Sequence, residues 1–300
     1  MTTAALKIAT APISWGISEV AGWGVQLPVG RVLDEMRGLG FTATEIGPDG
    51  FLPPEPAKKA EVLEGYGLTG IGSFVPVVLH QPDVDPLPRL ERELGDYAAV
   101  GARVLIVAAV TGETGYDITR TPLTETQWST LFANLDRIVE LAAANGVTAS
   151  LHPHVGTVVE TSDDVDRVLA GSSMPFCFDT GHLLIGGTDP VKFAETYASR
   201  VAHVHLKDVS TNGMLRVKNG EISYFDAIVA DELYRPLGQG DVDVRAIVTG
   251  LVDGGYDGWY VLEQDKVVRD NPAAGEGPVR DAEQSVTFLR GVLADLAATS

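Results

Sequence analysis

Short apolar runs alternate with longer amphipathic stretches from one end of the chain to the other. Each apolar run is bounded by Gly, Pro or polar residues, which is typical of buried strands. These runs predict eight strands, over residues 7–13, 42–47, 69–77, 103–109, 148–153, 175–180, 201–208 and 258–264. The stretches between and after them predict eight helices, over residues 29–39, 55–66, 86–100, 124–145, 161–171, 190–199, 243–253 and 279–297. This alternation predicts a (β/α)₈ TIM barrel, an α/β fold, rather than a doubly wound sheet.

One stretch departs from the alternation. Residues 209–241 follow the seventh predicted strand without a clear period, so we expect a long irregular loop there. The loops after the strands of such a barrel carry its active site, and this loop is expected to cover it. No linker, repeat or Gly-rich dinucleotide fingerprint interrupts the chain. A single domain over residues 1–300 is therefore expected.

Composition narrows the classes of partner. The formal net charge is −19, which opposes binding to a nucleic acid, because a phosphate backbone needs clustered Lys and Arg. A small neutral polyol or keto-sugar is compatible with this charge. No apolar run approaches the roughly 18 residues of a spanning helix, and no signal-peptide pattern occurs. We expect a cytoplasmic protein without membrane contact; the sequence sets no subunit number and is compatible with a homo-oligomer.

The seventh predicted strand carries an unusual row of ionisable residues. Alternation places Val204 and Leu206 toward the helices, and His203, His205 and Lys207 toward the barrel interior. A barrel interior is normally filled with branched apolar side chains, so three ionisable groups there need partners or a ligand.

Neighbouring predicted strands also end in imidazoles or carboxylates. The fifth carries His152 and His154 on one face, the sixth ends at Asp179 with His182 just beyond, and the second contributes Glu45. A set of two imidazoles and two carboxylates is expected to converge on a divalent metal ion: His152, Asp179, His205 and Glu263. Mixed N and O donors suit Mn²⁺, Co²⁺, Zn²⁺ or Fe²⁺ better than Mg²⁺ or Ca²⁺. Our first expectation is Mn²⁺ or Co²⁺.

Several motifs resemble a known group of proteins. "FDTGH", "HVHLKD" and "VLEQD", in this order after a strand-5 ligand, resemble the xylose-isomerase-like superfamily of sugar isomerases and epimerases. More narrowly, "APISWG", "GWGVQLP", "TEIGPDGFLP", "LHPHVGTVVET", "DTGHLLIGGTDP" and "RPLGQGDVD" resemble the inosose dehydratases of myo-inositol catabolism. The resemblance covers nearly the whole chain and implies that Asp179, His205 and Glu263 bind metal, with His182 near the substrate.

The strand-5 position departs from the wider superfamily. Isomerases and epimerases of this type usually have Glu where this chain has His152, and His154 falls where they place a substrate-facing residue. A neutral imidazole in place of a carboxylate leaves more of the metal's charge for a substrate oxygen. It also removes one of the two opposed carboxylates that epimerases use as acid and base. This exchange favours dehydration over epimerisation.

A dehydratase needs an electrophile for the ketone, a base for the neighbouring C–H and an acid for the departing hydroxyl. We expect removal of water from 2-keto-myo-inositol, with Lys207 as the base after a lowering of its pKa. The other candidates for acid or base are His154, Glu45 and His182. All three are also expected to contact the substrate. A salt bridge from Lys207 to Glu45, Asp179 or Asp208 is the structural alternative.

Two further residues are expected at the substrate. The indole of Trp15 suits the C–H face of a polyol, although packing at the barrel mouth explains it equally well. Arg235 is expected to reach over the site and donate hydrogen bonds to hydroxyls.

Other functions remain open at this stage. The alternative reaction is that of a metal-dependent keto-sugar epimerase, isomerase or related lyase. Barrel endonucleases share the Asp-x-x-His spacing, but they need a basic groove, which a net charge of −19 opposes. A polyol-binding protein without catalysis is a third class, and it would be favoured by a failure to bind metal.

Overall fold

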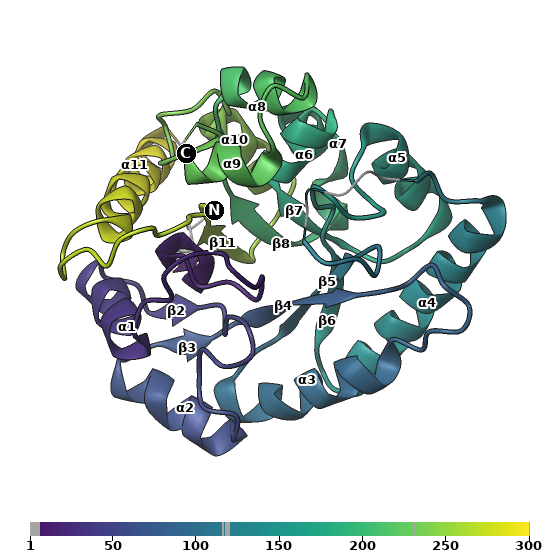
Figure 1. Ribbon diagram of the computed structural model, residues 1–300, viewed down its shortest axis with the longest axis horizontal. Helices are drawn as coiled ribbons and strands as arrows, with labels where there is room; N and C mark the ends of the chain where they lie inside the picture. Colours follow the sequence, from purple (N-terminus) through teal and green to yellow (C-terminus); the bar gives the residue numbers. More distant parts are fainter. Residues whose placement is uncertain (1–6, 116, 118–120, 231, 300) are drawn as a thin grey trace.

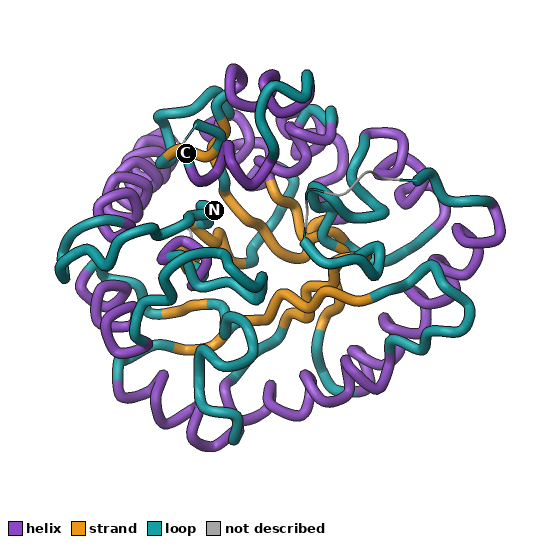
Figure 2. The backbone as a smooth tube through the Cα atoms, viewed as in Figure 1, coloured by secondary structure: helices purple, strands orange, loops and turns teal. Residues whose placement is uncertain are grey.

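The strands form one parallel sheet in the order β3-β2-β1-β11-β8-β7-β6-β5-β4. The computed structural model describes residues 7–115, 117, 121–230 and 232–299. The strand bounds are β1 (Lys7–Thr10), β2 (Ala43–Thr44), β3 (Thr69–Gly70), β4 (Gly72–Val77), β5 (Val104–Ala109), β6 (Thr148–Leu151), β7 (Phe176–Asp179), β8 (Val201–Leu206) and β11 (Trp259–Leu262). Figure 2 shows these strands in the middle of the molecule with helices around them.

The two ends of this sheet are joined through one residue, Ile71. Its N–H donates to the carbonyl of Thr44 at 3.0 Å, and its own carbonyl accepts from the N–H of Arg103 at 3.1 Å. Strands β3 and β4 are therefore two halves of one barrel strand, paired with β2 and β5 respectively. The sheet closes with eight barrel strands, which confirms the predicted (β/α)₈ barrel.

In the part of the chain that the structure describes, helices lie outside the barrel strands at the eight predicted positions (Figure 1). Their bounds are α1 (Val29–Gly38), α2 (Pro56–Gly65), α3 (Leu87–Val100), α4 (Glu125–Ala144), α5 (Ser162–Gly171), α7 (Pro190–Tyr197), α10 (Val244–Asp253) and α11 (Pro278–Thr299). Local chemistry explains several starts: Thr124 and Thr161 each form a capping box before α4 and α5. In the described part of the chain, no helix is both long and apolar enough to cross a membrane.

The predicted alternation of side chains along the strands is confirmed. Phe176 and Phe178 face outward, where both rings lie 5.4 Å from that of Phe193 on α7. A small apolar cluster that includes Ala43 and Val261 is separate from the main core between sheet and helices. The two-residue alternation therefore predicted correctly which side chains of these strands face the barrel interior and which face the helices.

The prediction of an irregular loop over residues 209–241 is wrong. This segment contains α8 (Thr211–Lys218), α9 (Tyr224–Val229) and a two-residue antiparallel ladder of β9 (Asp208–Val209) with β10 (Tyr234–Arg235). Ser210 and Ser223 cap the two helices with their side-chain oxygens. Each helix is too short to show a helical period in the sequence, which is why the pattern looked irregular.

Asp208 fastens the end of this segment to the barrel. Its buried carboxylate accepts hydrogen bonds from the N–H groups of Val209, Gly238, Gly240 and Val242 at 2.8–3.0 Å. A Cβ atom at Gly240 would lie 2.2 Å from Asp208 Oδ1, so this close approach requires glycine. Asp208 is thus committed to the backbone rather than to Lys207.

Three shorter elements of the described chain were also missed. Predicted strand 7–13 ends at Thr10, because η1 (Pro12–Trp15) turns the chain there. Predicted strand 175–180 ends at Asp179, where α6 (Thr180–Gly186) begins. The carboxylate of Asp179 caps α6 by accepting from the N–H groups of Gly181 and His182, both at 2.8 Å. A short η2 (Ala198–Arg200) precedes β8.

Candidate active site

A cavity of about 280 Å³ opens at the carboxyl ends of the barrel strands. Its polar side is formed by Glu45, His152, His154, Lys207, Tyr224, Glu263 and Asp265. Its apolar side is formed mainly by Ala11, Pro12, Ile13, Ile17, Trp23, Pro48, Phe74 and Pro76. A concave site with a few convergent polar groups at this end of a barrel is the usual place for small-molecule chemistry.

Three of the predicted metal ligands, Asp179, His205 and Glu263, have ligand atoms within 4.8 Å of one another, and His152 lies beside Asp179 at the edge of this group. Register pairs His205 on β8 with Asp179 on β7 and with Val261 on β11, two residues before Glu263. His205 Nδ1 lies 3.6 Å from Asp179 Oδ2 and 2.9 Å from Glu263 Oε2. His152 Nε2 lies 3.4 Å from the same oxygen of Asp179. All four side chains are at least nine-tenths buried.

These donors fit a divalent metal ion. Bonds of about 2.0–2.2 Å from N and O ligands bring neighbouring donor atoms to separations of this size. Among the described residues, His205 Nδ1 is a buried nitrogen without a hydrogen-bond partner, although it lies beside two carboxylates. Burial lowers the pKa of His205, but the neighbouring acidic groups, Cys177, Glu263 and Glu45, raise it well above its usual value. A divalent cation at this nitrogen would therefore take the place of a proton held beside Asp179 and Glu263.

Glu45 is held between two imidazoles. Its Oε1 atom lies 2.8 Å from His203 Nε2 and 2.7 Å from His205 Nε2. Burial by itself raises the pKa of Glu45, but the charge of His205 and these two hydrogen bonds lower that pKa far below its usual range. A carboxylate on Nε2 of His205 leaves Nδ1 as the coordinating atom. The geometry therefore supports a role for Glu45 in orienting a ligand, instead of the acid or base role that we expected.

Lys207 points into a group of acceptors. Its Nζ atom lies 2.8 Å from Asp265 Oδ1, 3.1 Å from Glu263 Oε2 and 3.3 Å from Asp179 Oδ2. Burial lowers the pKa of Lys207, but the three carboxylates outweigh it and raise the pKa well above its ordinary value. Without a metal ion, this environment opposes the lowered pKa that we expect for Lys207 and favours its ammonium form. The expected salt bridge to Asp179 is present.

His154 and His182 stack beside this lysine. Their ring centroids lie 3.7 Å apart. Burial is the main reason that the pKa of both imidazoles lies well below the usual value. His152 and Lys207 lower the pKa of His154 further, and His154 and Lys207 lower that of His182. His154 Nδ1–H donates to the carbonyl of Val155 at 2.7 Å, which leaves Nε2 as the nitrogen that accepts a proton.

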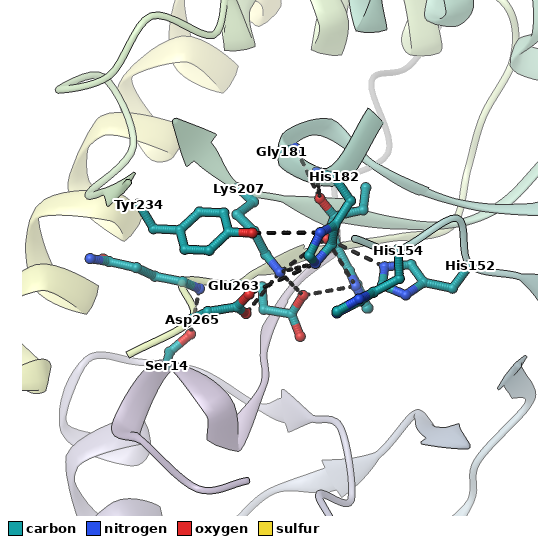
Figure 3. A network of polar contacts seen from close by, with 12 residues as sticks. Ser14, His152, His154, Gly181, His182, Lys207, Tyr234, Glu263 and Asp265 are labelled. Atoms are coloured by element: carbon teal, nitrogen blue, oxygen red, sulfur yellow. Dashed lines mark hydrogen bonds and ion pairs between the residues drawn. The ribbon is translucent and has the colours of Figure 1, made fainter. Parts of the chain in front are cut away.

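Figure 3 shows the polar network around these groups, with Lys207 between His182 and the carboxylates of Glu263 and Asp265. These residues come from separate elements: His182 from α6, Lys207 from the end of β8, Tyr234 from β10, and Glu263 and Asp265 from the loop after β11. His152 and His154 approach from the loop after β6. The barrel thus brings together groups that lie more than a hundred residues apart.

Two expected substrate residues lie elsewhere. Trp15 is fully buried, and its indole N–H donates to Glu35 Oε2 at 2.8 Å, so it does not line the cavity. Trp23 provides the indole at the cavity wall instead. Arg235 also stands outside the cavity lining, in the β10 ladder opposite Asp208. Both expectations depended on the direction of a side chain in a loop, which strand periodicity does not set.

Sequence reasoning also missed residues of the site. Asp265 lies two positions after Glu263, on the same face, so the alternation that found Glu263 was a usable signal. Tyr224 and Tyr234 come from the segment predicted as irregular, and no pattern pointed to them. Phe74 adds an aromatic ring beside His152, at 5.5 Å between centroids.

Comparison with known proteins places this geometry in a family. A family model described as "Xylose isomerase-like TIM barrel" matches residues 33–291. The rhizopine catabolism protein MocC of Rhizobium meliloti is 33% identical over 276 residues, which cover 87% of this chain and 82% of that protein. An inosose dehydratase of Geobacillus kaustophilus is 30% identical over 277 residues, covering 87% of each.

Solved structures agree at the level of the fold. L-ribulose 3-epimerase superposes with a TM-score of 0.71 at 17% identity, covering 98% of this chain and 96% of that one. The IolI protein with a bound zinc atom gives 0.68 at 12% identity, covering 97% and 99%. From the family model and the two curated relatives together, the chain belongs to the xylose isomerase-like TIM barrel family.

Proposed function

We propose that this protein is a metal-dependent hydro-lyase that removes water from 2-keto-myo-inositol, an inosose. The observation that carries the proposal is the combination of the four convergent ligands with a neutral imidazole, His154, and a cation, Lys207, on one cavity wall. Curated relatives named inosose dehydratase support the choice of reaction.

The ligand set is expected to bind Mn²⁺ or Co²⁺, with Zn²⁺ and Fe²⁺ as alternatives that the same mixed donors accept. The bound ion would supply a Lewis acid for the ketone and thereby acidify the neighbouring C–H. The chain's own residues account for the two proton movements.

His154 is proposed to take the proton from the carbon next to the ketone, at Nε2. The electron pair of that C–H bond forms a C=C bond conjugated with the ketone as the β-hydroxyl leaves. Lys207 is proposed to give a proton from Nζ to this hydroxyl, so that water departs. Solvent then returns the proton from His154 to Lys207, and the enzyme is restored. Lys207 therefore acts as the acid, while Glu45 holds His205.

The charges of the cavity favour an unphosphorylated substrate. Among the described residues that line the cavity, the two cations already face carboxylates: Lys207 as described, and Arg89, which pairs with Glu93 at 3.1 Å and Asp49 at 3.3 Å. A phosphate would have to displace one of these carboxylates and enter an acidic site. A neutral polyol ketone meets no such barrier.

The direct test uses purified protein reconstituted with Mn²⁺ or Co²⁺ and incubated with 2-keto-myo-inositol in ²H₂O. We expect enone or diketone absorbance to rise, with loss of one water by mass spectrometry. His154→Gln and Lys207→Met should both abolish the signal, and Trp15→Phe should keep it. Exchange of the α-proton without loss of water would overturn the proposal in favour of an epimerase or isomerase.

A further inference from the structure

Five buried side chains at the polar wall of the cavity form a closed ring of polar contacts. Lys207 Nζ donates to Asp265 Oδ1 at 2.8 Å and lies 3.0 Å from His182 Nε2. His182 Nδ1 lies 3.5 Å from the hydroxyl of Tyr234, which lies 2.7 Å from that of Tyr224. The hydroxyl of Tyr224 completes the ring by donating to Asp265 Oδ2 at 3.2 Å.

Counting donors and acceptors gives this ring one direction. An ammonium has no acceptor, so His182 Nε2 must accept from Lys207, and the proton of the neutral imidazole is on Nδ1. Nδ1–H then donates to the oxygen of Tyr234. Tyr224 gives its only proton to Asp265, so Tyr234 must give its own to Tyr224. Every link runs from Lys207 through His182, Tyr234 and Tyr224 to Asp265.

One contact competes with this arrangement. The N–H of Val155 also points at His182 Nδ1, at 3.4 Å. Accepting from Val155 would move the proton of His182 to Nε2, where it would face the ammonium of Lys207. The charged contact is the shorter of the two, and the oxygen of Tyr234, as the acceptor that Nδ1–H needs, tips the balance against Val155.

We propose that Tyr234 is a positioning residue that holds His182 in its Nδ1–H form, so that Nε2 fixes the ammonium of Lys207. Tyr224, which lines the cavity, anchors the hydroxyl of Tyr234 and connects helix α9 to the same ring. Lys207 also lies over the ring of Tyr234, with Nζ 5.2 Å from its centroid. Figure 3 shows Tyr234 directed at His182 across the front of Lys207.

Helix α9 is itself held on the barrel, which makes Tyr224 a fixed anchor. The carboxylate of Asp117 accepts from the N–H groups of Tyr224 and Phe225, at 2.6 and 3.0 Å. The ring of Phe225 packs edge-to-face on Trp23 at 5.5 Å between centroids. The segment over residues 209–241 therefore contributes Tyr224 to the cavity wall and both tyrosines to the ring.

The first test reads the tautomer of His182 and requires no turnover. Protein labelled with ¹⁵N at its six histidines is loaded with diamagnetic Zn²⁺, and His182 is assigned from the signal that His182→Gln lacks. Long-range ¹H–¹⁵N spectra of the wild type should show the proton on Nδ1. Tyr234→Phe should move it toward Nε2, because Nδ1 loses its acceptor and Val155 supplies a donor.

Tyr260→Phe is the matched control. Tyr260 is fully buried in β11, and among the described residues its hydroxyl has no hydrogen-bond partner. The Tyr260→Phe variant should leave the tautomer of His182 unchanged. Tyr224→Phe removes the hydroxyl that anchors Tyr234 but keeps Tyr234 as the acceptor for His182, so it should shift the tautomer less and in the same direction. If Tyr234→Phe does not fold, the result for Tyr224→Phe tests the proposal in its place. A wild-type proton on Nε2, or a tautomer that neither variant changes, would overturn the proposal.

The second test is kinetic and rests on the proposed function. Tyr234→Phe should lower kcat about 10-fold with little change in KM, because Lys207 is misplaced for proton donation but the cavity wall is intact. A change confined to KM would overturn the positioning role. If the wild type does not dehydrate the inosose but shows the Nδ1–H tautomer and its shift, the proposed function fails and the positioning ring stands.

Discussion

The two halves of the barrel mouth have opposite chemistry. Strands β6, β7, β8 and β11, here called the polar half, end in the proposed metal ligands and Lys207. Strands β1 to β4 and the loops after them, the apolar half, contribute Ile13, Ile17, Trp23, Phe74 and Pro76 to the cavity. The opposite charges of the polar half neutralise one another because their side chains lie next to one another. The apolar half keeps water away and strengthens their interactions.

Charged residues also stand in the apolar half: Asp49 and Arg89 pair with each other at the cavity wall, and Glu45 is buried there. Glu45 follows β2 in the apolar half, yet its carboxylate reaches across the barrel to His203 and His205. A buried carboxylate among apolar neighbours would be costly, so it is found only where it has such partners. The comparison therefore predicts that substitutions in the polar half, and at Glu45, affect metal and charge, whereas those in the apolar half affect substrate binding.

Asp179→Asn should have the largest effect. The amide oxygen can still cap α6, so the fold should persist, but the ligand charge is lost. We expect metal occupancy, measured by elemental analysis, to collapse and dehydration to fall about 10³-fold, because a Lewis acid supplies several kcal/mol. Asp189→Asn is the control, since Asp189 caps α7 through two N–H groups in the same way. Full metal occupancy in Asp179→Asn would contradict the assigned site.

Lys207→Met should destabilise the metal-free protein strongly. It leaves Asp179, Glu263 and Asp265 without their cation, and breaking a buried ion pair costs about 3–5 kcal/mol. Denaturant titration in chelator should show this loss, and added metal should recover part of it by neutralising two of the three carboxylates. Lys59→Met, which removes a less buried partner of Asp96, should cost less and show no metal dependence. Equal losses in the two variants would argue against the charge balance.

Glu45→Gln should weaken metal binding without abolishing it. The amide provides a poorer acceptor for His205 Nε2–H, and loss of such a partner typically costs 10–100-fold in affinity. Competition with a chelator measures this change directly. Glu35→Gln, at a carboxylate outside the cavity that binds Trp15 and Arg31, should leave the affinity as it is. An unchanged affinity in Glu45→Gln would return Glu45 to the list of acid–base candidates.

The metal-free protein should lose stability as the pH falls below about 6.5. His154 and His182 have a lowered pKa in the folded state, so they stay neutral while the unfolded chain takes up protons near 6.5. The unfolded state then binds more protons, and each imidazole contributes a slope of up to about 1.4 kcal/mol per pH unit. Urea unfolding in chelator at pH 7.5, 6.5 and 5.5 should show a shallower slope for His154→Gln. An identical slope would mean that His154 is protonated in the folded protein.

The apolar half should give the smallest effects, on KM alone. Trp23→Leu should raise KM for the inosose several-fold, because an aromatic face at the cavity wall is lost. Trp15→Phe should leave KM unchanged and cost about 1 kcal/mol of stability through the lost hydrogen bond to Glu35. A raised KM in Trp15→Phe with an unchanged KM in Trp23→Leu would instead support Trp15 as the indole that contacts the substrate.

The accuracy of the sequence-based predictions follows the regularity of the backbone. The barrel, the faces of its strands and the convergence of His152, Asp179, His205 and Glu263 all follow from period two along parallel strands, whose ends meet at one rim. Predictions failed where no period applies. Trp15 lies in a turn, Arg235 in a short ladder, and the helices at 211–218 and 224–229 are brief.

The sequence by itself determined which strand ends carry ionisable groups, because alternation and strand order are local properties of the chain. The tertiary structure alone decided what those groups do. The proposed role of Lys207 as proton donor depends on three carboxylates that stand at the ends of β7 and β11, the two strands beside β8. The proposed role of Glu45 in orienting His205 depends on β2 lying across the barrel from β8. Protonation states and hydrogen-bond directions depend on neighbours through space, and local patterns do not specify them.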